Sequence, residues 1–376
     1  MPCVFDFQLS RPPFETKQQK TFDWLLEAHC VAEKPHLQSD REQSAFREDL
    51  RKQLSHVGCK EERIAKRGHI LSDFTHLEWD RMEIYRLQES STGQSLSARM
   101  KFFDAFVENL FDAYYPIHSD PPDDLIHVSC TGYLSPSGAQ KLVAKRDWGS
   151  MTTVTHAYHM GCYGAFPAMR MGIGFLHSGK QKIDIVHTEI CSLHLNPSLH
   201  EAQHLVAQSL FSDGFMKYSL ASDVKQTHFK PIAAHEEIIA NTADSMTWDI
   251  SDWGNAISLS KKIPILIARV LPGYLKTLCV KAGLPESILT IAHFAIHPGG
   301  PKILEHIQQY LRLSDSQMTY SFEIMHAYGN MSSATLPHIW DAILKCGCAK
   351  HQDFLISLAF GPGLSISGSI MEKICY

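Results

Sequence analysis

Two segments about half a chain apart follow the same order of local patterns. Residues 125–130 form an apolar run typical of a buried strand, and a glycine-containing turn then leads into a helical pattern. Residues 288–296 are also expected to form a strand, followed by the loop 297–301 and a helix over 302–311. Because a strand, a glycine loop and a helix make one structural unit, this recurrence favours a duplicated α/β fold.

The rest of the chain fits the same class. We expect strands over 152–158 and 183–190, because both runs are rich in β-branched residues. A polar, turn-rich stretch at 223–231 is the expected boundary, which divides the chain into residues 1–229 and 230–376. Apolar residues spaced three or four apart predict the helices, at 14–54, 79–115, 166–176 and 196–210.

Composition excludes several classes of protein. Hydrophobic residues make up 44% and charged residues 20% of the 376 residues, which is typical of a globular chain and not of a disordered one. A formal net charge of -5 gives no basic excess for nucleic acid. The longest apolar run, at 263–268, is too short to span a membrane. Ten scattered cysteines favour a reduced, cytoplasmic protein.

Cys162 is the first candidate for chemistry. It lies where the β-rich run becomes a helix, between Gly161 and Gly164, and a tight turn of this kind exposes a side chain. A helix N-terminus lowers the pKa of a thiol, so the sequence predicts a thiolate accessible near neutral pH. A buried structural cysteine is the alternative, since most free cysteines are of that kind.

Two further residues are suited to work with a thiol. His297 follows a predicted strand and precedes a Pro-Gly-Gly-Pro loop, where the glycines allow a ligand to approach closely. Asn330 stands in the segment 329–334, and an asparagine amide can donate to a developing oxyanion. Taken singly, a solvated histidine and a turn asparagine explain these positions equally well.

Together, these segments resemble the type III polyketide synthases, the chalcone-synthase-like branch of the thiolase fold. The resemblance covers roughly residues 60–370 and follows the family's order of motifs. The matching pieces are Met160-Gly161-Cys162, Leu210-Phe211-Ser212-Asp213-Gly214, Met246-Thr247-Trp248, His297-Pro298-Gly299-Gly300-Pro301, Gly329-Asn330-Met331-Ser332-Ser333-Ala334 and Phe360-Gly361-Pro362-Gly363.

The resemblance implies a homodimer whose subunits have a five-layered αβαβα core built from two pseudo-repeated halves. The first half would carry Cys162, which accepts an acyl group from a CoA or carrier-protein thioester. The second half would carry His297 and Asn330, which hold the malonyl-CoA thioester oxygen as decarboxylation turns it into an enolate. Repeated condensation and cyclisation would follow without a separate cofactor.

The resemblance also assigns a substrate cavity. Phe211 matches an aromatic gatekeeper between the CoA tunnel and the cavity, although core packing explains a phenylalanine equally well. Trp248 replaces the glycine of chalcone synthases, which disfavours a flavonoid-type product and favours an alkylpyrone or alkylresorcinol. The positions expected to shape the cavity are Thr131, Gly132, Cys191, His194, Trp248, Ile257 and Ser332.

Delivery of the acyl group stays open at this stage. The family grips CoA phosphates with basic residues before the first core strand, but the register of the basic residues here does not match that pattern. A mixed-charge helix face explains them as well, so acyl delivery from a carrier protein is the alternative to CoA. The residues concerned are Arg51, Lys52, Lys60, Arg63, Lys66 and Arg67.

Three other functions compete with this interpretation. A ketoacyl synthase III would use the same three residue types for a single condensation. Residues 200–204 read His-Glu-Ala-Gln-His, a literal zinc-protease pattern, but a third ligand is missing, and with 22 histidines the rate of chance matches is not negligible. A non-catalytic scaffold homologue is disfavoured because Cys162, His297 and Asn330 are all present.

Overall fold

A continuous mixed sheet of nine strands forms the centre of the computed structural model, which describes residues 1–376. Neighbouring strands run parallel at both ends of the sheet and antiparallel in its middle. In spatial order the strands are β11 (His293–Ile296), β12 (Phe354–Gly361), β13 (Ser365–Ile374), β8 (His228–Ile238), β1 (Pro2–Ser10), β7 (Gly214–Ser222), β6 (Lys182–Glu189), β4 (Asp124–Ser129) and β5 (Thr153–Tyr158).

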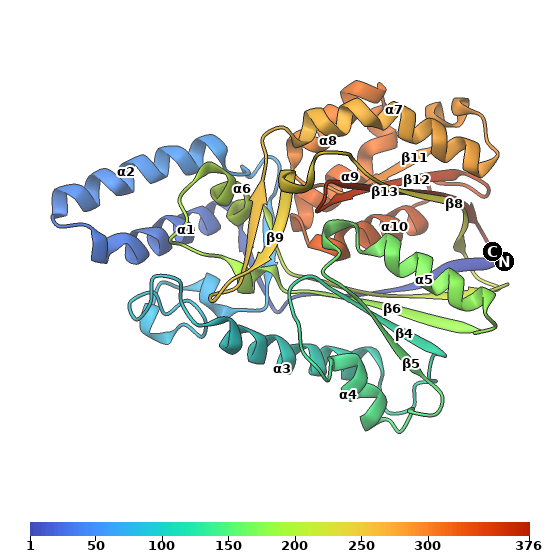
Figure 1. The fold of residues 1–376 in the computed structure, drawn as a ribbon, viewed down its shortest axis with the longest axis horizontal. Helices are drawn as coiled ribbons and strands as arrows, with labels where there is room; N and C mark the ends of the chain where they lie inside the picture. Colours follow the sequence, from blue (N-terminus) through green and yellow to red (C-terminus); the bar gives the residue numbers. More distant parts are fainter.

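The sheet consists of two halves that meet at β1 and β8. The first four strands of the order belong to the C-terminal half and the other five to the N-terminal half, and the pairing of Val4 with Phe229 joins them. Three groups of helices alternate with the two halves, which gives the expected five-layered αβαβα, thiolase-like arrangement (Figure 1). These helices are α3 (Leu96–Tyr114) with α4 (Gly138–Lys145), α5 (Ala165–His177) with α10 (Thr335–Lys345), and α7 (Ile263–Ala282) with α8 (Pro301–Leu311).

Three apolar clusters fill the spaces between these layers. One lies under α3 and α4, a second surrounds α5 and α10, and the third lies under α7 and α8. Because both faces of the sheet are covered, nearly every residue of β4, β6 and β12 is buried. This explains why these strands show no alternation of apolar and polar residues of the kind that a half-exposed strand has.

Helix α7 is long and apolar enough to cross a membrane by length and composition alone. In the structure it buries Ile267, Leu271 and Leu275 against the C-terminal half of the sheet. A core helix passes the same test of length and composition; packing accounts for the buried face of α7, while Ile265 and Val280 stay exposed.

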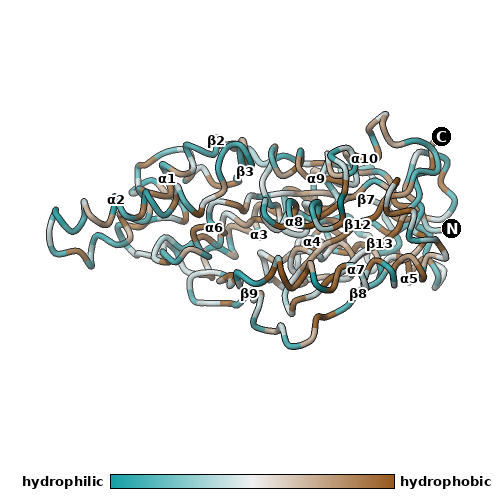
Figure 2. The backbone as a smooth tube through the Cα atoms, turned by 90° about the horizontal axis from the view of Figure 1, so that it is seen from above, coloured by the Kyte–Doolittle hydropathy of each residue, from teal (hydrophilic) through white to brown (hydrophobic).

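Helices α1 (Gln18–Glu33) and α2 (Asp40–Val57) form a hairpin that extends from one end of the molecule (Figure 1). Helix α2 buries only Leu50 and Leu54, and its outer end is hydrophilic (Figure 2). Ser39 caps the start of α2 by accepting a hydrogen bond from the backbone N–H of Glu42. The prediction of helices within 14–54 is confirmed here, except that its first residues, Phe14–Lys17, form the short strand β2.

The structure differs from the predicted elements in four places, one of which is a strand that was not predicted. Residues 2–10 form β1 near the middle of the sheet, although no strand was predicted there. Asp6 has φ 54° and the register shifts between Phe5 and Gln8, so the bulge hides the alternation that marks a strand. Predicted elements at 79–115, 196–210 and 288–296 are shorter in the structure: α3 begins at Leu96, α6 spans Ala202–Leu210, and β11 starts at His293.

Cysteine pairing also differs from expectation. Cys346 and Cys348 form a disulfide in the loop after α10, whereas the sequence analysis predicts a chain without disulfides. The other eight cysteines are free. Cys346 and Cys348 are bonded to each other across Gly347, so neither offers a free thiolate to a metal ion.

We predict that Trp340 is a main contributor to the stability of the central layer. Its ring is fully buried in α10, packs on Phe166 and Tyr218, and donates a 2.8 Å hydrogen bond to Ser357. Trp340→Ala should lower the free energy of unfolding in urea by ~3–5 kcal/mol, because it leaves a large cavity. Tyr310→Ala, at a half-exposed position on α8, should change it by less than ~0.5 kcal/mol. Equal effects of the two changes would contradict this packing.

Candidate functional site

Cys162 lies in a short turn, Gly161–Tyr163, that connects β5 to α5. Gly161 has φ 73°, and a Cβ there would lie 2.5 Å from Cδ of Pro362. Gly361 is equally confined, because its Cβ would meet the ring of Tyr163 at 2.2 Å. The turn of the N-terminal half and the loop after β12 therefore pack directly on each other, and both glycines are required by close approach. The predicted strand-to-helix turn at Cys162 is confirmed.

His297 follows directly after β11, and its backbone N–H donates a 2.8 Å hydrogen bond to the carbonyl of Leu358 in β12. The carboxyl ends of these parallel strands lie at one edge of the sheet, beside the loop that packs on the Cys162 turn. His297 is 1% exposed, and neither of its ring nitrogens has a protein partner. Burial lowers its pKa to about 3, so the imidazole is neutral at physiological pH.

Asn330 is fixed by a short parallel bridge to the residues after α6. Its N–H donates to Leu210 at 3.0 Å, and its carbonyl accepts from Ser212 at 2.9 Å. The side-chain Oδ1 accepts a 2.8 Å hydrogen bond from the N–H of Ser332, so the orientation of the amide is fixed. Its Nδ2 has no partner within hydrogen-bond distance, which leaves a buried donor available to a ligand.

The electrostatic state of Cys162 differs from the prediction of a lowered pKa. Burial is the largest cause, and the nearby Glu189 carboxylate is the second; together they raise the pKa of the thiol to about 12. Ser332 and Asn330 oppose this shift but do not reverse it. The expectation failed because a helix N-terminus was considered without the desolvation of a thiol enclosed by the second half of the chain.

Glu189 is a buried carboxyl group that the sequence analysis did not identify. It ends β6, and its Oε2 accepts hydrogen bonds of 3.0 Å from both the N–H of Cys130 and Oγ1 of Thr131. Ser333 donates to Oε1. Burial raises the pKa of Glu189 to about 7 despite these hydrogen bonds. An acidic residue at the end of an apolar strand was the available signal.

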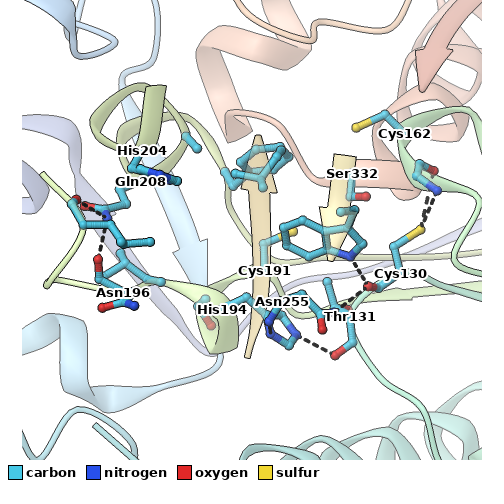
Figure 3. Close-up of a pocket in the computed structure, with 18 of the residues that line it drawn as sticks. Cys130, Thr131, Cys162, Cys191, His194, Asn196, His204, Gln208, Asn255 and Ser332 are labelled. Atoms are coloured by element: carbon cyan, nitrogen blue, oxygen red, sulfur yellow. Dashed lines mark hydrogen bonds between the residues drawn. The ribbon is translucent and has the colours of Figure 1, made fainter. Parts of the chain in front are cut away.

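One cavity brings Cys162 together with most of the predicted pocket residues (Figure 3). It runs from Cys162 past Cys191 to a polar end near His204 and Gln208. Gly132 does not line this cavity, because its Cβ would lie 2.2 Å from the ring of Phe103 and it therefore faces α3. The predicted residues that do line the cavity are Thr131, Cys191, His194, Phe211, Trp248, Ile257 and Ser332.

Several cavity residues escaped the sequence analysis because they belong to segments without a motif. The hairpin of β9 (Met246–Ile250) and β10 (Asn255–Leu259) contributes Asn255 beside Trp248. Others come from the irregular segment between β6 and α6, where spacing carries no signal. The additional lining residues used below are Cys130, Leu195, Asn196, Leu199, His204, Ala207, Gln208 and Asn255.

The basic residues considered for CoA binding are mostly engaged elsewhere. Arg67 is buried and donates 2.7 Å hydrogen bonds to the carbonyls of Gln208 and Phe211, so it holds the end of α6 and the base of Phe211. Arg63 pairs with Glu305, and Lys66 pairs with Glu15. Arg51 and Lys52 share Glu48 on the surface of α2.

The His-Glu-Ala-Gln-His segment does not have the geometry of a zinc site. His200 precedes α6 and contacts His29 and Glu33, whereas His204 lies within α6 and lines the cavity. The two histidines therefore do not occupy one face of a helix. The structure contains no group of three or more potential metal-ligating side chains.

Comparison with known proteins identifies relatives over most of the chain. Residues 231–375 match the family model of the C-terminal domain of chalcone and stilbene synthases. The chain is 30% identical to the probable polyketide synthase 1 of Dictyostelium discoideum. The matched segment makes up 66% of this chain but only 8% of the much longer relative. It is 25% identical to the type III polyketide synthase C of Arabidopsis thaliana over 66% of this chain and 67% of the relative.

The fold is shared with solved structures across the full chain. The C-terminal type III polyketide synthase domain of Steely1, a type I/III hybrid from Dictyostelium, superposes with a TM-score of 0.80. The superposition covers 99% of both chains at 24% sequence identity. This similarity establishes the thiolase-like fold.

We predict that Glu189 controls the ionisation of Cys162. Glu189→Gln removes a nearby negative charge, so the thiol pKa should fall and alkylation by iodoacetamide at pH 8 should become several-fold faster. At pH 6 the alkylation rates of the variant and the wild type should be closer, because wild-type Glu189, with a pKa of about 7, is then largely protonated. Peptide mass spectrometry would follow labelling of Cys162, with Glu305→Gln at the surface as control. Unchanged labelling at pH 8 would exclude this coupling.

Proposed function

We propose that the chain is a type III polyketide synthase, the class of protein that it resembles in sequence and fold, and that it extends a Cys162-bound acyl group by decarboxylative condensation with malonyl-CoA. One observation carries the proposal. Cys162 lines a cavity, and Asn330 lies close enough to act on the pKa of its thiol. Nδ2 of Asn330 and both ring nitrogens of His297 are buried without protein partners. Buried donors without protein partners are suited to a ligand oxygen.

Acyl loading is the first proposed step. The Cys162 thiol transfers its proton to His297 as its sulfur attacks the carbonyl carbon of an acyl thioester. The neutral imidazole is able to accept this proton, since burial keeps His297 unprotonated beforehand. The carbonyl then re-forms, the carrier thiolate leaves with that proton, and the acyl group stays on Cys162 as a thioester.

Decarboxylation and condensation follow at the same donors. Malonyl-CoA loses CO2, and the electron pair of the broken carbon–carbon bond forms an enolate whose oxygen accepts hydrogen bonds from His297 and Asn330. Such preorganised donors are most effective in a site that excludes water. The enolate carbon attacks the Cys162 thioester, and the sulfur leaves as a thiolate, which takes up a proton from solvent. The product is a chain two carbons longer on CoA, which returns to Cys162 for the next cycle.

The cavity supports an alkyl-tailed pyrone or resorcinol as product. Trp248 fills space beside Cys130, because its Nε1 donates a 2.7 Å hydrogen bond to the Cys130 carbonyl. Small and aliphatic side chains continue the cavity beyond it at Cys191, Leu195 and Leu199. We assign the acyl tail to this continuation and cyclisation to the space near Cys162.

Partners and location are part of the same proposal. The acyl starter arrives as a CoA or carrier-protein thioester, and the paired state of the surface arginines and lysines favours neither source. We propose a cytoplasmic homodimer in which β5, the edge strand of the sheet, contributes to the interface. An unpaired edge with few charges is a common site of association.

We predict that the three residues fail in different ways when replaced. Cys162→Ala should abolish acyl loading and product formation. His297→Ala and Asn330→Ala should fold normally but decarboxylate malonyl-CoA ~10²–10³-fold more slowly, because each removes an oxyanion donor. Release of CO2 from labelled malonyl-CoA measures this step, and the exposed Cys375→Ala serves as control. Condensation by Cys162→Ala at the wild-type rate would refute the proposed mechanism.

We also predict that cavity width sets starter range and product length. Cys191→Trp should block octanoyl and longer starters while acetyl starters still react, because the indole closes the path to Leu195. Trp248→Gly should permit further extensions by removing bulk near the reacting end. Product masses from malonyl-CoA with a series of acyl-CoAs report both effects. If neither substitution alters starter range or product length, the assignment of the cavity is wrong.

A further inference from the structure

Asn255 is a buried cavity residue whose role the reaction above does not explain. It begins β10, is 1% exposed, and lines the cavity together with His194 and Trp248. Among the cavity-lining side chains, Asn255 presents a carbonyl oxygen, Oδ1, without a protein donor. A buried acceptor without a partner is uncommon, and polar ligands frequently complete such groups.

The orientation of the Asn255 amide is determined by its neighbours. Its Nδ2 lies 3.2 Å from the carbonyl oxygen of Cys130, which can only accept hydrogen bonds. The reverse orientation would place two acceptor oxygens together, so the nitrogen must face Cys130 and Oδ1 must take the other position. Trp248 donates to the same carbonyl at 2.7 Å and fixes it from a second side.

The backbone of Asn255 is also fixed by a hydrogen bond. Its N–H donates a 2.9 Å hydrogen bond to Nδ1 of His194. Because Nδ1 accepts, Nε2 of the neutral ring carries the hydrogen and donates to the carbonyl of Thr131 at 2.8 Å. Figure 3 shows Asn255 and His194 beside Thr131, on the part of the wall close to Cys130. The amide and the backbone of Asn255 are therefore both held in one position.

We propose that Oδ1 of Asn255 is a specificity-determining acceptor for an O–H group of the bound acyl chain near its thioester end. This inference rests on the proposed function for its ligand class, an acyl thioester. Two sources supply such an O–H: the enol of a β-keto chain, and the hydroxyl of a 3-hydroxyacyl starter. A saturated acyl chain has neither and leaves the acceptor unpartnered, which lowers its affinity.

The test measures binding in a background that cannot react. Cys162→Ala protein is titrated calorimetrically with three N-acetylcysteamine thioesters: octanoyl, 3-hydroxyoctanoyl and 3-oxooctanoyl. We expect at least one oxygenated thioester to bind about tenfold more tightly than octanoyl, as one hydrogen bond provides. Preference for the 3-hydroxy probe identifies a starter hydroxyl, and preference for the 3-oxo probe identifies the chain enol.

Asn255→Leu, introduced into the Cys162→Ala protein, should reduce the preference for the oxygenated thioester over octanoyl to about twofold or less. The affinity for octanoyl should be kept, because the amide is replaced by an apolar side chain of similar size. Ser258→Ala, on the same strand but outside the cavity wall, is the matched control and should retain the preference. Asn255→Ala replaces the leucine variant if a melting curve shows that the latter is unfolded.

Absence of any preference in Cys162→Ala, or a preference that persists without Asn255, overturns the inference. So does failure of all three thioesters to bind. The proposed function is judged separately, by product formation from malonyl-CoA in the wild-type protein. Selective binding without product would retain the role of Asn255 and refute the polyketide synthase reaction.

Discussion

The close packing of the Gly161–Tyr163 turn against the loop after β12 is the contact on which the site depends. It brings the N-terminal half, which carries Cys162, against the C-terminal half, which carries His297. Side chains larger than hydrogen at Gly161 or Gly361 would push the two halves apart. The pairing of β1 with β8 also fixes the two halves relative to each other, because it joins their strands into one continuous sheet. Two independently folded halves would not fix this geometry.

Burial is the second constraint, because it sets the charge of every group near Cys162. It raises the pKa of the thiol and of Glu189, and it lowers the pKa of His297. At neutral pH the thiol and the imidazole are therefore uncharged, and Glu189 is about half ionised. Preorganised donors such as Asn330 have their largest effect under these conditions. The unpartnered state of His297 and Asn330 is consistent with a site built for a transient oxyanion.

Much of the fold and the reacting residues could be predicted from the sequence. An apolar run located β4 and a run of β-branched residues located β6, and glycine turns located Cys162 and His297. Strand β1 was missed because a bulge at Asp6 interrupts its pattern. The thiol pKa was predicted in the wrong direction because desolvation depends on packing by distant segments. Glu189 and Asn255 belong to no local motif, so only tertiary structure brings Glu189 close to Cys162 and Asn255 to the cavity.

The central claim is that Cys162 carries the acyl chain, and trapping that intermediate tests it most directly. The protein would be mixed briefly with octanoyl-CoA, quenched in acid, and measured by intact mass followed by peptide mapping. The account predicts one octanoyl group per chain, located on Cys162 and released by malonyl-CoA as longer products. Acylation at another of the ten cysteines, or no acylation while product still forms, would contradict it.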